Sequence, residues 1–156
     1  MLKTRIPIKE HHVRQFVIAR FGNNSPTIDM TKKSMIGTLA EIACEKVGFR
    51  HVLPKTDLDE KVCITLLYPD SLKNHFIHPA KLLLVAKLFN YLFSQAFLEC
   101  METSLSLGIS DYEAVSVFME RYGITDDMIA ADSLRKKWRD HQRYMQKKMD
   151  TLLATA

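Results

Sequence analysis

One long apolar stretch, residues 79–107, limits how this chain can fold more than any other feature. Hydrophobic side chains recur almost all round a helical projection of it, and Pro79 suits a first helical turn. Its most apolar part, residues 82–93, includes Lys87 and Asn90 and is far shorter than the roughly 20 apolar residues of a membrane span. We therefore expect a buried central helix against which the rest of the chain packs, and no membrane association.

Length and composition place the chain among ordinary globular proteins. With 156 residues, of which 47% are hydrophobic and 26% charged, it fits a single domain over residues 1–156. Its cysteines are odd in number, with neither the spacing of a zinc site nor the density of a secreted scaffold, so they indicate reduced core residues. Near the start, Pro7 interrupts the only hydrophobic run, so we expect a cytoplasmic protein without an export signal.

The part before residue 79 alternates short strand and helix patterns. Helical spacing of apolar residues before Gly22 and before Gly48 predicts two helices. Alternating apolar residues before Pro69 predict the best strand, which would form a small sheet with two others. The expected elements are a strand at 4–8, a helix at 9–21, a strand at 27–30, a helix at 31–47 and a strand at 61–68.

The part after residue 107 predicts a compact trihelical unit that resembles a helix-turn-helix. A helix capped by Ser110 or Asp111 should run to Tyr122 and end at Gly123. A short helical turn over 125–131 and a last helix, capped by Asp132 or Ser133 and running to about residue 153, should follow. The fold class is therefore mainly α (α+β), with a sub-boundary near 107–110 between a core at 1–107 and a helical unit at 110–153.

The positive charge of the chain is concentrated in one short segment. Residues 1–131 hold 15 Lys or Arg and 15 Asp or Glu, so this part is neutral. Residues 132–150 hold seven Lys or Arg against three Asp, which accounts for the whole formal net charge of +4. Clustered cations raise the local potential in a way that scattered cations do not. This segregation is typical of a module that meets a polyanion.

The same segment divides into two faces when it is projected as a helix. One narrow arc is mostly apolar, which predicts packing against the domain or a partner helix; it holds Leu134, Trp138, His141, Met145, Met149 and Leu152. The arc nearly opposite is cationic, with Asp140 at its edge; it holds Arg135, Lys136, Arg139, Arg143 and Lys147.

These two faces predict binding of double-stranded DNA by the last helix. Leu134 and Trp138 would anchor the helix, and its long cationic side chains would reach the walls of a groove. The guanidinium of an arginine near the helix start can also donate two hydrogen bonds to O6 and N7 of a guanine. The predicted DNA contacts are Arg135, Arg139 and Arg143, with Lys136 and Lys147 on phosphates.

Other uses of this helix fit the sequence as well. A basic face can simply keep a helix soluble, or it can meet an acidic protein partner in a helical interaction module. RNA fits less well, because Tyr144 is the one aromatic residue that accompanies the basic face. The apolar stripe with Met145, Met149, Leu152 and Leu153 either packs within the monomer, which is the simpler expectation, or pairs with a second copy in a homodimer.

The C-terminal third also resembles a family. It reads F-M-E-R-Y-G-I-T-D-D at residues 118–127 and S-L-R-K-K-W-R at residues 133–139. This is similar to small, mostly uncharacterised bacterial proteins of phages and conjugative elements, whose tails read F-M-x-x-Y-G-[IF]-T-x-[DE]-D followed by L-K-K-x-[YW]-x-R. The resemblance covers some 35 residues well. It implies a DNA-associated role in a mobile element, such as transcription regulation.

Catalytic, cofactor and metal sites are not expected. The sequence contains no nucleophile elbow, zinc-protease, P-loop or dinucleotide-binding motif. The histidine pairs at 11–12 and 75–78 have no thiol or acidic partner at ligand spacing. The carboxylates at 57–60 are typical of a solvated turn. We therefore expect a protein that is not an enzyme and binds no cofactor, metal or small-molecule substrate.

Overall fold

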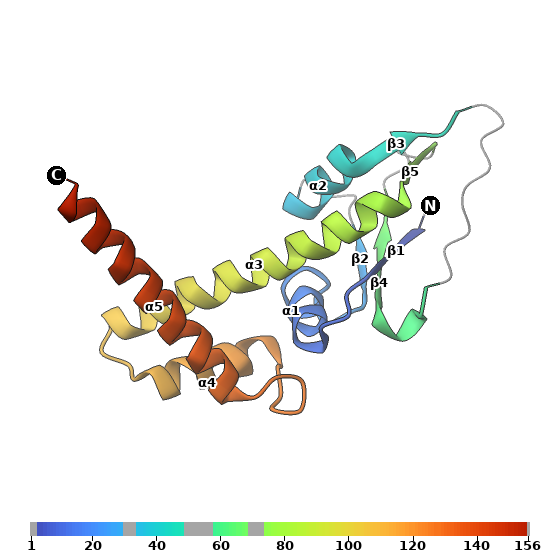
Figure 1. Ribbon diagram of the computed structural model, residues 1–156. Coiled ribbons are helices and arrows are strands. Elements are labelled where there is room, and N and C mark those ends of the chain that lie inside the picture. The colour runs from blue at the N-terminus through green and yellow to red at the C-terminus, as the bar shows by residue number, and fades with distance from the viewer. Residues whose placement is uncertain (1–2, 30–33, 49–57, 69–73, 156) are drawn as a thin grey trace. The chain divides into compact units, whose positions relative to one another are not determined.

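The computed structural model describes residues 3–29, 34–48, 58–68 and 74–155. The chain forms two compact units, Met1–Phe93 and Ser94–Ala156 (Figure 1). It is mainly helical with a few short strands, as predicted. The first unit contains β1 (Lys3–Pro7), α1 (His11–Phe21), β2 (Thr27–Asp29), α2 (Met35–Ala43), β3 (Cys44–Lys46), a 3-10 turn (Glu60–Val62), β4 (Cys63–Leu67) and β5 (His75–Ile77). The helix α3 (Pro79–Ser106) runs through both units, and α4 (Asp111–Tyr122) and α5 (Ala131–Ala154) complete the second.

A three-stranded sheet with the order β1-β4-β2 forms the base of the first unit. The central strand β4 pairs antiparallel with β1 and parallel with β2. Ile6 and Ile64 face each other in the register, and both are fully buried. The alternation of these isoleucines with more exposed residues turns one face of the sheet toward the core. The strands predicted at 4–8, 27–30 and 61–68 are confirmed, except that Met30 lies outside the described residues and the last strand begins at Cys63.

Helix α1 covers the buried face of this sheet. Val13, Phe16 and Val17 are buried at helical spacing, and α1 contacts β2 and β4. The Phe16 ring meets the edge of Phe93 in α3, with the ring centroids 5.5 Å apart. Gly22 ends the helix as predicted: a Cβ there would lie 2.1 Å from the carbonyl oxygen of Ser25. The predicted helix is therefore confirmed as α1, and its hydrophobic face packs against the sheet and α3.

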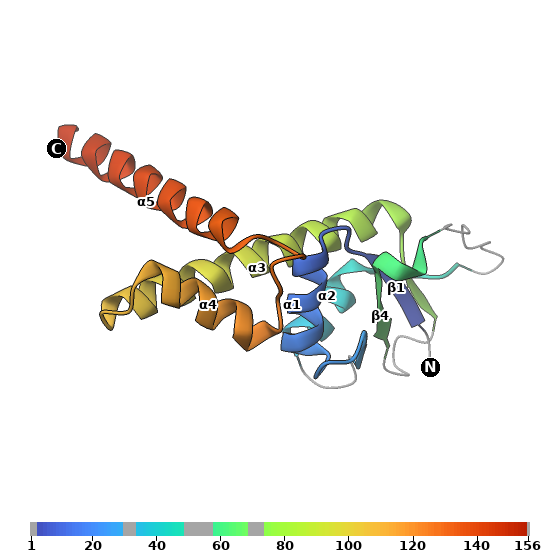
Figure 2. The ribbon, with the colours of Figure 1, turned by 90° about the horizontal axis from the view of Figure 1, so that it is seen from below.

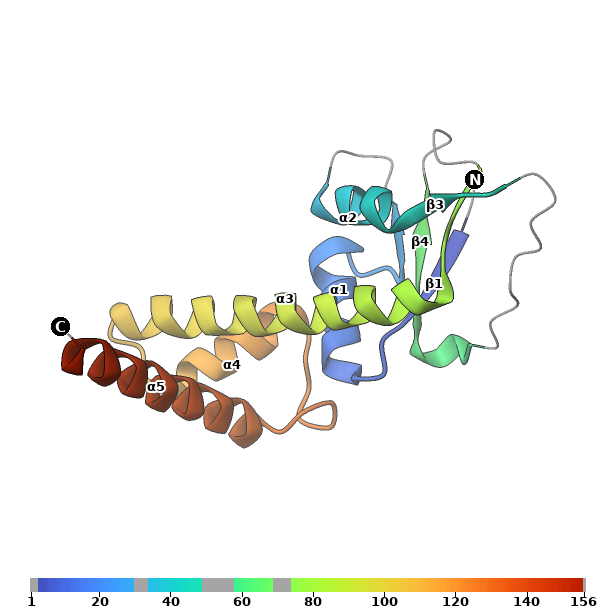
Figure 3. The same ribbon diagram turned by 45° about the horizontal axis from the view of Figure 1, so that its top comes forward.

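The helix predicted at 31–47 is wrong at its end. Residues 31–33 lie outside the described residues, and α2 stops at Ala43 and leads directly into β3 (Figure 3). Strand β3 pairs antiparallel with β5, which we did not predict. The side chain of Ser34 accepts a hydrogen bond from the Gly37 N–H, which fixes the start of α2. At its end, pairing with a strand 30 residues away outweighs local helix propensity.

The long apolar helix forms where it was predicted, but only one side of it is buried. Phe89, Phe93 and Phe97 lie in this buried stripe, whereas Leu83 and Leu84 are about 60% exposed. The expectation of a buried central helix therefore holds for one side of α3 only, the side that includes the contact with α1. Among the described residues, α3 is the one helix long and apolar enough to cross a bilayer by length and composition.

The second unit packs α4 and α5 against the C-terminal half of α3. Phe97 of α3 and Phe118 of α4 meet edge to face, with ring centroids 5.2 Å apart. As predicted, Ser110 caps the start of α4, and its side chain and that of Glu113 form a reciprocal capping box. The break predicted at 107–110 is the turn between α3 and α4, whereas the two compact units divide inside α3. The single-domain assignment stays a prediction.

The connection between α4 and α5 is a single turn. Residues 125–131 were predicted to form a short helical turn, and Met128 and Ile129 both donate to the Thr125 carbonyl in such a turn. The start of α5 is capped by Asp126, whose carboxylate accepts a hydrogen bond from the Ala131 N–H at 3.2 Å. The predicted caps Asp132 and Ser133 are therefore wrong. Side chains that bond the local backbone compete with helix formation here.

Gly123 is a position where glycine is required. It ends α4 in the left-handed conformation, with φ 64°. An alanine there costs about 1–2 kcal/mol, because its Cβ crowds the backbone in this region. We expect Gly123→Ala to lower the free energy of unfolding by this amount in a urea titration. Gly48→Ala, where a Cβ meets nothing within 4 Å, should change the free energy of unfolding by less than about 0.5 kcal/mol. Equal losses in the two variants would contradict a special requirement for glycine at position 123.

Candidate nucleic-acid interface

The first two turns of α5 are anchored in the second unit. Leu134 is fully buried, Trp138 is 6% exposed, and α5 contacts α4. The His141 ring stacks on Trp138 with centroids 5.8 Å apart, and its Nε2 lies 3.8 Å from a carboxylate oxygen of Glu102 in α3. Leu134 and Trp138, the residues proposed as anchors, therefore fix the rotation of the helix about its own axis.

The apolar stripe of α5 continues without cover beyond this anchor. Met145, Met149 and Leu152 are 42%, 51% and 55% exposed. Figure 2 shows the C-terminal half of α5 leading away from α3 and α4. The simpler expectation, that these side chains pack within the monomer, is therefore wrong for the described residues. Residues 142–154 of α5 are exposed on every side.

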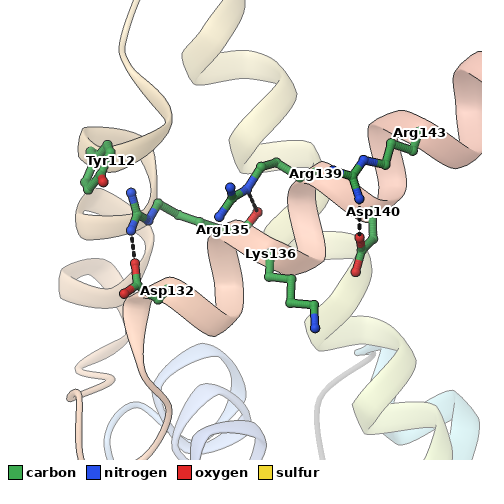
Figure 4. Close-up of a pocket in the computed structure, with 7 residues that line it drawn as sticks. All are labelled: Tyr112, Asp132, Arg135, Lys136, Arg139, Asp140 and Arg143. Carbon is green, nitrogen blue, oxygen red and sulfur yellow. Dashed lines mark hydrogen bonds and ion pairs between the residues drawn. The ribbon is translucent and has the colours of Figure 1, made fainter.

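Charged side chains of α5 and one tyrosine of α4 line a groove of about 620 Å³ (Figure 4). Four cations and two carboxylates from α5 meet in it, so positive charge is in excess. Each carboxylate precedes its ion-paired cation by three residues along the helix. The lining residues are Tyr112, Asp132, Arg135, Lys136, Arg139, Asp140 and Arg143.

Arg135 is held inside the fold more firmly than the other cations. Its side chain is 12% exposed, and its guanidinium forms an ion pair with Asp132. The guanidinium also lies over the ring of Tyr112, 3.5 Å from the centroid, in a cation–π contact. Figure 4 shows it pointing from α5 toward α4. Arg135 therefore ties the two helices together, a role that the sequence did not predict.

Lys136, Arg139, Arg143 and Lys147 present their charges to solvent. The Arg139 Nε donates a long hydrogen bond, 3.5 Å, to the carbonyl of Arg135. Arg143 lies 3.7 Å from the Asp140 carboxylate, while its side chain remains 77% exposed. Among the described residues, the carboxylate ion-paired with this face, Asp140, belongs to α5 itself. We call these four residues the basic face from here on.

Comparisons with protein-family models, curated proteins and solved structures find no match. No group of three His, Cys, Asp or Glu side chains within the described ranges could hold a metal ion.

Tyr112 and Ser94 belong to this region although the sequence did not single them out. Tyr112 lies in the first turn of α4 and meets Arg135 across the helix pair. Ser94 of α3 accepts a hydrogen bond from the Nζ of Lys137 at 2.7 Å. No local pattern marks either residue, because each contact joins segments more than 20 residues apart in the sequence.

Lys137 is set apart from the basic face by burial. Burial lowers the pKa of its ammonium from the usual 10.5. The unfolded chain therefore binds more protons than the folded chain between the lowered pKa and 10.5, and stability rises with pH across this interval. We expect the unfolding free energy of the wild type, measured relative to Lys137→Met, to increase as the pH approaches 10.5. Parallel pH curves for the two proteins would contradict a buried ammonium.

Proposed function

We propose that this protein binds double-stranded DNA through the basic face of α5. The observation that carries the proposal is a row of four exposed cations on one side of a helix whose opposite side is anchored by Trp138. Cations placed along a rigid rod can neutralise successive phosphates and release their condensed counterions, which is the main source of affinity for DNA. Lys136 and Lys147 would serve as phosphate contacts, and Arg139 and Arg143 would lie between them.

The biological setting of this binding is a mobile element. The resemblance of residues 118–139 to phage and conjugative-element proteins supports it, with a role in transcription regulation or in DNA structure. The end of α3, α4 and α5 supply three packed helices for a helix-turn-helix-like unit. The single turn at 125–130 departs from the usual middle helix of that motif.

Binding of a labelled duplex, measured against salt concentration, tests the proposal. At about 50 mM salt we expect saturable binding that weakens steeply as salt increases, because each released counterion makes the affinity depend on salt. A duplex that fails to bind at this concentration would overturn the proposal.

A second candidate is a helical interaction module with an acidic protein partner. The uncovered stripe of Met145, Met149 and Leu152 favours it, because basic amphipathic helices bind grooves that combine apolar pockets with acidic rims. Absence of duplex binding, together with a partner whose capture is lost in Met145→Glu/Met149→Glu, would decide for this candidate. DNA binding that is unchanged by these two substitutions would decide against it.

A further inference from the structure

We infer that α5 binds the sugar–phosphate backbone of duplex DNA without reading base sequence, through residues 136–148. This inference rests on the proposed function and specifies what the site recognises. It separates two modes that the sequence left open: an operator-specific regulator and a protein that binds any duplex. Three features of α5 support the second mode.

The N-terminal end of α5 is acidic and unsuited to enter a groove of DNA. Asp126 caps the Ala131 N–H, Asp132 pairs with Arg135, and Asp127 lies in the same turn with its carboxylate bonded to the Thr125 hydroxyl. Carboxylates at a helix N-terminus stabilise the helix through its dipole. They also repel phosphates, yet a recognition helix contacts base edges with its N-terminal residues. The DNA must therefore lie against the middle and C-terminal part of α5.

Three of the side chains able to read bases are occupied or turned elsewhere. Arg135, the arginine nearest the helix start, is held by Asp132 and Tyr112. Its guanidinium therefore has little freedom to form a bidentate hydrogen bond with a guanine. The amide of Gln146 donates to Asp150 at 2.9 Å. Gln142, the other amide of this segment, lies beside the Met149 stripe in helical projection. The cations that remain exposed are Lys136, Arg139, Arg143 and Lys147, and all four are long enough to reach phosphates.

The length of the remaining basic segment matches a short run of phosphates. Residues 136–148 rise about 18 Å along the helix, at about 1.5 Å per residue. Phosphates of one strand follow each other at about 3.4 Å along the duplex axis. The four cations of the basic face can therefore neutralise about four phosphates. This number corresponds to a slope of about −3.6 in a plot of log affinity against log salt.

Selection from a pool of random duplexes tests the inference on the full chain at about 50 mM salt. We expect the protein to retain DNA without enriching any sequence. Gln142→Ala/Gln146→Ala should bind within about twofold of the wild type, because losing a base contact would weaken binding by about 5- to 150-fold. An enriched motif, or a loss of more than tenfold in this variant, would overturn the inference while DNA binding stands. Retention of no DNA at all would overturn both.

Discussion

Reversing the charges of Arg139 and Arg143 together is expected to weaken duplex binding about 100-fold at about 50 mM salt. Each substitution to Glu removes a cation from the basic face and adds a charge that phosphates repel. Because each phosphate contact contributes about 0.9 to the salt slope, losing two contacts should lower that slope by about 1.8. Anisotropy of a labelled duplex in a salt series measures both quantities.

The matched control is Lys9→Glu/Lys87→Glu, which changes the net charge by the same amount. Both lysines are exposed, and both lie in the first unit, outside α5. We expect this variant to keep the wild-type salt slope and to lose only a few-fold in affinity through the weaker overall field. Equal losses in the two variants would show that net charge, and not the basic face, determines binding.

The helices and strands that local chemistry determines were predictable. The capping box at Ser110 and the left-handed Gly123 define α4 within a few residues, so its bounds could be read from the sequence. The period-two pattern at 63–67 likewise identified β4. By contrast, β3 and β5 exist because they pair with each other across the chain. Three-residue strands carry too little periodicity to be identified alone.

The sequence predicted which residues share each face of α5, but it did not predict which residues of the neighbouring helices contact them. Turning α5 at 100° per residue placed Trp138 inward and Arg139 outward, as the structure does. The same projection treated Arg135 as an exposed cation, because it contains no information about Tyr112 on the neighbouring helix. It also extended the buried stripe to Met145 and Leu152. Periodicity shows which residues share a face, but it does not show where the neighbouring helix ends.

Replacing Trp138 with alanine is expected to destabilise the protein by about 3–5 kcal/mol, which is the usual cost of deleting a buried aromatic side chain. Trp138 is 6% exposed, and its ring carries the stacked His141, so its loss leaves a cavity where α5 meets the second unit. A urea titration followed by far-UV circular dichroism measures the change. Fluorescence is unsuitable, because Trp138 is the only tryptophan of the chain.

Met145→Ala and Met149→Ala supply the comparison, since both residues belong to the same stripe but lie beyond the anchor. With half of each side chain already in water, each substitution should cost less than about 0.5 kcal/mol. A cost above about 2 kcal/mol for Met145→Ala would mean that the stripe is covered in solution, by the chain itself or by a second copy. A dependence of that cost on protein concentration separates these two cases, because only pairing between copies follows mass action. A small cost leaves the distal half of α5 free to lie along a duplex.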